Sequence, residues 1–137
     1  MTSTQPWTPL EIFQLFVSMT VADTIVASTN AYAARLKAKW PSFRWYNVTA
    51  KEFYCVFAII IFMGMVDVPT ISSYWSSDSF FGQDFIQESG MSRNRFANIL
   101  SALHICDLEE DDENQRKKGR GDKYDPLLKV RPVMEHL

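Results

Sequence analysis

The chain has 137 residues, a common size for one domain, with 14 Lys and Arg residues against 16 Asp and Glu residues. Hydrophobic residues make up 47% of it and aromatic residues 14%, which excludes a disordered or fibrous protein. The net charge of −2 excludes a strongly basic polyanion binder overall, although it leaves room for a local basic patch. The two cysteines form no CxxC pair and no signal peptide is visible, so we expect a reducing intracellular compartment.

The amino-terminal residues 1–8 are polar for the most part, and we expect them to be flexible. Thr8 and Glu11 then have the spacing of a capping box, in which each side chain satisfies a free backbone N–H of the first turn. Pro9 occupies the first helical position, where its fixed φ and missing N–H are well tolerated. The pattern predicts a helix from Pro9 to about Ser18.

The next helix is expected to be longer. Thr20 and Asp23 repeat the cap spacing, and an amphipathic pattern continues to about Lys39. Trp40 precedes a proline, and the residue before proline is disfavoured in the helical region, so the helix ends there.

Residues 49–66 form the most hydrophobic stretch. Thr49 and Glu52 make another capping box, and every residue from Phe53 to Val66 is apolar or Gly. This run is shorter than the ~20 residues that span a bilayer, and acidic residues close both ends, so no membrane segment is predicted. We expect a central helix at about 50–66, buried on all sides by the other helices.

Residues 70–90 alternate hydroxyl residues with aromatic ones, and we interpret them as two or three short helical turns. Their possible caps are Thr70, Ser76 or Ser77, and Asp84. Ser92 caps a further helix, whose apolar positions follow the i, i+3, i+4, i+7 pattern at Phe96, Ile99, Leu100 and Leu103.

An acidic block followed by a basic block occupies residues 109–123 without an apolar residue, which predicts a mobile charged loop at 108–123. Apolar periodicity resumes from Tyr124, and Pro132 requires that a helix there either kinks or begins near Arg131. No stretch alternates convincingly as a strand does. The predicted fold is all-α, an irregular helical domain in which residues 9–137 surround the central helix.

Enzymatic and metal sites find little support in the sequence. His104 and Cys106 are two residues apart, but the remaining His136 and Cys55 complete no obvious zinc ligand set. The carboxylates near residue 110 could hold magnesium in principle, yet we expect them on a solvated loop that fixes no ligand geometry. No GxSxG turn and no phosphate-binding Gly loop is present. We predict no catalytic residue, no metal and no cofactor.

Basic residues are the better functional lead, because phosphate contacts by Lys and Arg need no particular base sequence. One group is a dense cluster in the charged segment, a second lies in the first turn of a helix, and a third lies near the carboxyl end. The alternative is that the basic block only pairs with the acidic block before it. The DNA-binding candidates are Arg93, Arg95, Arg116, Lys117, Lys118, Arg120, Lys123, Lys129 and Arg131.

A series of motifs gives the chain a family resemblance. These are TN-x-YA at 29–33, MGMVDVP at 63–69, SYW at 73–75, MSRNRFANILSALHICD at 91–107 and KVRPVMEHL at 129–137. In this order and spacing the chain resembles the piggyBac transposase family, from about Pro9 to Leu137.

The resemblance implies a relation to enzymes that cut and paste DNA with an RNase H-like core, whose acidic residues bind two divalent metals. By that resemblance the first catalytic Asp lies beyond the KxRP motif, and no Asp of this chain matches a catalytic position. What matches is the first part of a helical region that in such transposases holds two subunits together and contacts transposon-end DNA.

Three readings stay open at this point. We expect a non-catalytic helical domain that binds duplex DNA or forms a homodimer, resident in the nucleus, with KKGR at 117–120 as a weak import signal. The alternatives are a module for a protein partner or an inert remnant, and a fragment of an intact transposase whose catalytic aspartates follow Leu137.

Overall fold

The computed structural model describes residues 6–76 and 84–135, and these contain helices and no strand, which confirms the all-α prediction. The helices in chain order are α1 (Pro9–Phe16), α2 (Met19–Lys39), α3 (Ala50–Met65), the 3₁₀ helix η1 (Ile71–Trp75), α4 (Asp84–Glu88), α5 (Arg93–Ala102), α6 (Leu108–Arg120) and α7 (Arg131–Met134).

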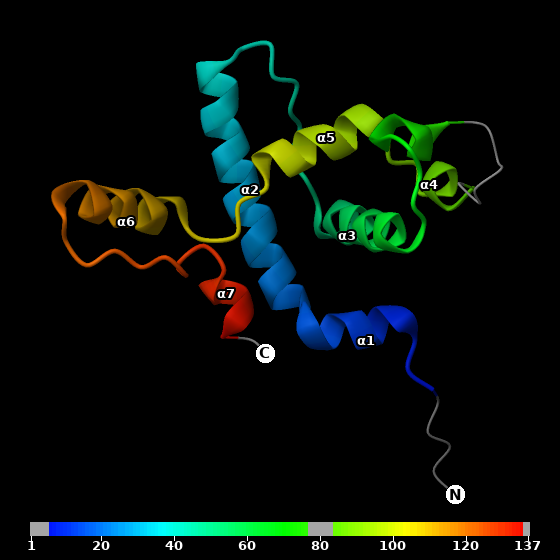
Figure 1. Ribbon diagram of the computed structural model, residues 1–137, viewed down its shortest axis with the longest axis horizontal. Coiled ribbons are helices and arrows are strands. Elements are labelled where there is room, and N and C mark those ends of the chain that lie inside the picture. Colours follow the sequence, from blue (N-terminus) through cyan, green and yellow to red (C-terminus); the bar gives the residue numbers. More distant parts are fainter. Residues whose placement is uncertain (1–5, 77–83, 136–137) are drawn as a thin grey trace, which may run out of the picture.

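The 21-residue helix α2 is the central element (Figure 1). It contacts α3, α5 and α6, so that α3 and α5 lie on one side of it and α6 on the other. Its buried face includes Ala22, Thr29 and Ala33, which are small side chains that let neighbouring helices approach closely. The prediction that the helix near 50–66 is the central element is therefore not confirmed, although α3 contributes Phe53, Val56 and Ile59 to the core.

Helix α3 begins as predicted, because the Thr49 hydroxyl accepts from the N–H of Glu52 at 3.2 Å and the Glu52 carboxylate accepts from the N–H of Thr49 at 3.3 Å. It is not surrounded on all sides. Its buried residues are Phe53, Val56 and Ile59, whereas Ile61 is 49% exposed and Met65 79% exposed. An apolar sequence shows that a face can be buried, but not that another element covers it.

The boundary between α1 and α2 differs from the prediction by two residues. Helix α1 starts with the predicted Thr8 capping box, but α2 is capped by Ser18, whose hydroxyl accepts from the N–H of Val21 at 3.3 Å. Thr20 lies inside the helix and is not its cap. Both Ser18 and Thr20 are suitable cap residues by type, so composition alone could not choose between them.

No single described helix has the length and apolar character to cross a bilayer; α1 and α2 meet that test only as a pair, across a bend of 68°.

Short helices are present in the described parts of the segment before α5, at 71–75 and 84–88, in agreement with the sequence. Thr70 caps η1 and Ser92 caps α5, each accepting from the N–H three residues on. Asp84 lies in the first turn of α4, and the alternative cap Ser77 lies outside the described residues. Helix α7 begins at Arg131, with Pro132 in its first turn, which was the second of the two predicted possibilities.

Residues 108–120 form helix α6, so the prediction of a charged loop there is wrong. Asp107 caps its amino end by accepting from the N–H groups of Glu109 and Glu110. At its carboxyl end Gly121 has φ +78, and the N–H of Asp122 bonds to the carbonyl of Lys117 at 2.9 Å, as in a Schellman motif. Both ends of the helix are therefore capped.

The order of charges explains why α6 is stable without an apolar stripe. Acidic side chains occupy its first turn and basic side chains its last turn, which is the arrangement that the helix dipole favours. Its buried residues, Asp111 and Asn114, are both polar. The charge blocks that suggested a loop are thus the signal of a helix, in combination with Asp107 and Gly121.

Candidate nucleic-acid interface

The carboxyl end of α6 carries the densest group of exposed cations, namely Arg116, Lys117, Lys118 and Arg120. The acidic end of α6 lies beside α2, where Asp112 pairs with Arg35 at 2.9 Å, and the basic end points away from α2 (Figure 1). A helix fixes the relative positions of these cations better than the expected loop would. We define these four residues together with Lys123 as the basic end.

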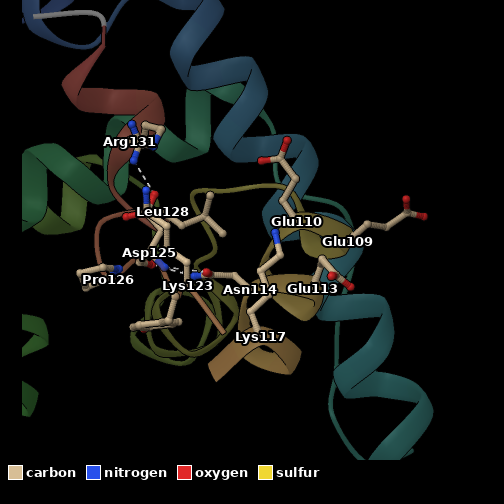
Figure 2. A pocket seen from close by; sticks show the side chains of 11 residues that line it. Glu109, Glu110, Glu113, Asn114, Lys117, Lys123, Asp125, Pro126, Leu128 and Arg131 are labelled. Carbon is tan, nitrogen blue, oxygen red and sulfur yellow. Dashed lines mark hydrogen bonds and ion pairs between the residues drawn. The ribbon is translucent and has the colours of Figure 1, made fainter. Parts of the chain in front are cut away.

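A cavity of about 820 Å³ lies between α6 and the segment that returns from it (Figure 2). Along α6 the charged lining changes from carboxylates to a lysine, and on the returning segment Asp125 pairs with Arg131. The acidic lining residues are Glu109, Glu110, Glu113 and Asp125, and the cations are Lys117, Lys123 and Arg131. An anion is therefore attracted to the end of this cavity formed by Lys117 and Lys123.

The returning segment is held to α6 by Asn114. Its side-chain NH₂ donates to the carbonyl of Asp125 at 2.7 Å, and its carbonyl oxygen accepts from the N–H of Asp125 at 2.9 Å (Figure 2). Asp125 in turn accepts from the Arg131 guanidinium and from the N–H of Leu127. These bonds, that of Arg131 first, lower the pKa of the Asp125 carboxyl below its ordinary value.

Lys129 is also engaged by the protein. Its Nζ lies 3.2 Å from Oδ2 of the buried Asp111, and the bond to this carboxylate raises the pKa of Lys129. His104 Nε2 lies 3.5 Å from the same oxygen, while burial lowers the pKa of His104. Asp111 was expected to be solvated, and the structure instead places it between a lysine and a histidine.

Arg95 has a structural position. Its side chain is only 6% exposed, and it donates to both carboxylate oxygens of Glu52, at 2.9 and 3.0 Å, and to the carbonyl of Tyr46 at 3.0 Å. The guanidinium also lies over the rings of Trp45 and Tyr46. Little of it remains accessible to a phosphate.

The nine predicted residues thus fall into two groups. Four have a carboxylate within 4 Å: Arg95, Arg116, Lys129 and Arg131. In the described part of the chain the other five have none: Arg93, Lys117, Lys118, Arg120 and Lys123. The structure brings four of these five together at the basic end, whereas Arg93 lies on the exposed face of α5. Sequence reasoning did not identify Asn114, which positions the returning segment and has no distinctive motif around it.

Comparisons with known proteins connect the chain to one group. The family described as Transposase IS4 matches residues 8–137. The human PiggyBac transposable element-derived proteins 3, 2 and 5 are 29%, 28% and 26% identical to the chain over 95%, 95% and 93% of it. The chain spans only about a fifth of their length, with 19%, 19% and 22% of each covered. No solved structure matches the chain.

Proposed function

Because the chain belongs to the Transposase IS4 family and is derived from a piggyBac transposase, we propose that it binds duplex DNA through the basic end of α6. The resemblance indicated by its motifs is confirmed at the level of the family. The observation that carries the proposal is the cluster of Lys117, Lys118, Arg120 and Lys123, for which the described part of the chain provides no carboxylate partner.

The spacing of charges along α6 supports the proposal. The acidic and basic groups are centred about seven residues apart, which is roughly 10 Å along a helix. That separation is about one Debye length at 0.1 M salt, so the carboxylates only partly screen the cations from an approaching phosphate. The net charge of −2 for the whole chain is then compatible with local attraction at one end.

The proposal assigns no catalytic step to these residues. The carboxylates of Asp111 and Asp125 contact Lys129, His104 and Arg131 and so hold segments together. Nuclear residence is part of the same proposal, since duplex DNA is the partner. The proposal does not extend to any activity of the longer relatives, most of whose residues have no counterpart in this chain.

The test is fluorescence anisotropy of a labelled DNA duplex with the purified 137-residue chain at 50 and 200 mM salt. Three phosphate contacts predict a slope of log K against log salt of about −2.7, and hence roughly 40-fold weaker binding at the higher salt. The variant K117Q/K118Q/R120Q should lose most of this affinity and most of this slope.

A matched control is K37Q/K39Q/K51Q, which removes the same charge from exposed positions on α2 and α3. It should bind almost as the parent does. Equal losses in the two triple variants would show that only the overall charge matters, and absence of binding at 50 mM salt would refute the proposal.

A second candidate function, self-association, is favoured by an apolar groove between α1 and α3. The groove is lined entirely by apolar and aromatic side chains, and the adjoining surface of α1 is also apolar and exposed. Because groove and apolar helix surface occur on one chain, two copies can pair about a two-fold axis. The groove residues are Pro9, Leu10, Phe13, Tyr54, Ala58, Ile61, Phe62, Met65 and Phe85.

Solution mass tests this candidate. The parent chain should show a concentration-dependent dimer mass, and I61E, which places a charge in the groove, should be a monomer. T24E serves as the control, because Thr24 is exposed on α2 and does not line the groove. A parent that stays monomeric at high concentration would exclude self-association without affecting the proposal for DNA.

A further inference from the structure

Three potential metal ligands meet where the chain passes from α5 to α6. His104 and Cys106 lie in the connection, and Asp111 lies in the first turns of α6. One ligand atom from each lies within 4.8 Å of the other two. The sequence alone offers only the first two, because Asp111 is expected there on a solvated loop, and the formation of α6 supplies the third.

The two separations measured from His104 fit a tetrahedral metal. His104 Nε2 lies 3.7 Å from Cys106 Sγ and 3.5 Å from Asp111 Oδ2. Ordinary zinc bond lengths at tetrahedral angles place such pairs about 3.6 and about 3.4 Å apart. These two separations therefore match a zinc site to within about 0.1 Å, and the third, between Cys106 Sγ and the Asp111 carboxylate, is at most 4.8 Å.

The three side chains of the cluster are largely buried, and neighbouring residues hold His104 in place. Cys106 is 1% exposed and Asp111 8% exposed. His104 is fixed by stacking on Tyr32, with ring centroids 4.9 Å apart, and by Thr29, which bonds to its backbone N–H and carbonyl at 3.2 Å. These contacts hold the backbone and the ring of His104 in place beside Cys106 and Asp111.

Within this cluster one buried oxygen atom lacks a hydrogen-bond partner. Oδ1 of Asp111 has no hydrogen bond among the described residues, although its Oδ2 faces both His104 and Lys129. A buried carboxylate oxygen without a partner costs free energy, and a cation bound by both oxygens of the Asp111 carboxylate would remove this cost.

We propose that His104, Cys106 and Asp111 form a binding site for a divalent cation of the zinc class, with water as the fourth ligand. An imidazole, a thiolate and a carboxylate are the zinc ligand types, whereas magnesium and calcium prefer oxygen alone. Binding transfers the Cys106 thiol proton to solvent. The site fastens α6, and with it the basic end, to the end of α5.

Lys129 is the group that competes with the metal, because its ammonium lies 3.2 Å from Asp111. Replacing it by Met removes the competing positive charge while keeping a long apolar stem. The variant K129M should therefore bind the metal more tightly than the parent, although it loses an ion pair. A cluster that serves only as a hydrogen-bond network predicts a less stable K129M that gains nothing from metal.

The experiment titrates Co²⁺, and then Zn²⁺ as competitor, into the reduced, metal-free 137-residue chain. One equivalent of Co²⁺ should give the visible bands of tetrahedral coordination and a near-ultraviolet band from the thiolate, and Zn²⁺ should displace both. The variant C106S should lose the thiolate band. C55S is the matched control, because Cys55 is half-buried on α3 and has no part in the cluster, so its spectrum should equal that of the parent.

Stability provides a second readout. Zinc should raise the unfolding temperature of the parent and of C55S in a concentration-dependent way, and should do so much less for C106S. Octahedral cobalt spectra without a thiolate band, or equal responses of C106S and C55S, would overturn the proposal. Because C106S changes one sulfur to oxygen, its own circular dichroism spectrum without metal shows whether it has folded.

Discussion

Replacing Arg95 by Met tests whether this residue has a structural role or contacts DNA. The substitution removes three hydrogen bonds, two of them to the carboxylate of Glu52, and leaves that carboxylate with few partners. Breaking a buried ion pair by removing one member typically costs about 3–5 kcal/mol. Because the Glu52 side chain is 25% exposed and water can reach it, we expect a loss of about 2–3 kcal/mol.

Urea unfolding followed by circular dichroism measures this loss. With a denaturant slope of roughly 1–3 kcal/mol per M, the midpoint should fall by about 0.7–3 M. The double variant R95M/E52Q removes the unpaired charge but keeps a residue that can serve in the capping box with Thr49, so it should recover about 1 kcal/mol. The control R93M, two residues earlier on the exposed face of α5, should change the stability by less than about 0.5 kcal/mol.

The reasoning is refuted if R95M unfolds within about 0.5 kcal/mol of the parent, which is the range of ordinary surface substitutions. Under conditions where R95M is folded, its affinity for DNA should equal that of the parent. A selective loss of DNA affinity would restore Arg95 to the group of phosphate contacts.

Two further predictions concern α6 and the segment after it. G121A should destabilise the chain by about 1 kcal/mol in urea unfolding, because Gly121 has φ +78. The control G119A, inside the same helix, should stabilise the chain by up to about 1 kcal/mol. Equal effects of the two substitutions would contradict the observed helix end. The Asp125 carboxyl should titrate by NMR below its ordinary pKa of 3.8, and R131Q should raise that pKa. Since folding lowers this pKa, the associated stability is present above pH 3.8 and is lost as the pH falls through the folded-state value; an ordinary pKa in the parent would disprove the Arg131 contact.

Local signals predicted most helix starts correctly. The capping boxes at Thr8 and Thr49 and the cap at Ser92 are present, because a cap needs only residues within one turn of each other. The error at 108–120 has a different origin. There the absence of apolar residues indicates a loop, whereas Asp107 and Gly121, which cap the two ends of α6, indicate a helix.

The candidate interface was predictable only in part. The cluster at 116–123 is visible as a run of basic letters, and it remains exposed in the structure. Whether a single cation is available depends on carboxylates far away in sequence, such as Glu52, which lies 43 residues before its partner Arg95. Spacing along the chain contains no information about such pairs.

The sequence by itself determined the helical class, the capped amino ends of α1, α3 and α5, and the family, since each depends on neighbouring residues or on the order of motifs. Only the tertiary structure decided that α2 is central, that one side of α3 is exposed, and that His104, Cys106 and Asp111 meet. These features depend on which surfaces face each other. Hydrophobicity indicates how favourable burial would be, but the packing of α2 against α3, α5 and α6 decides which side chains become buried.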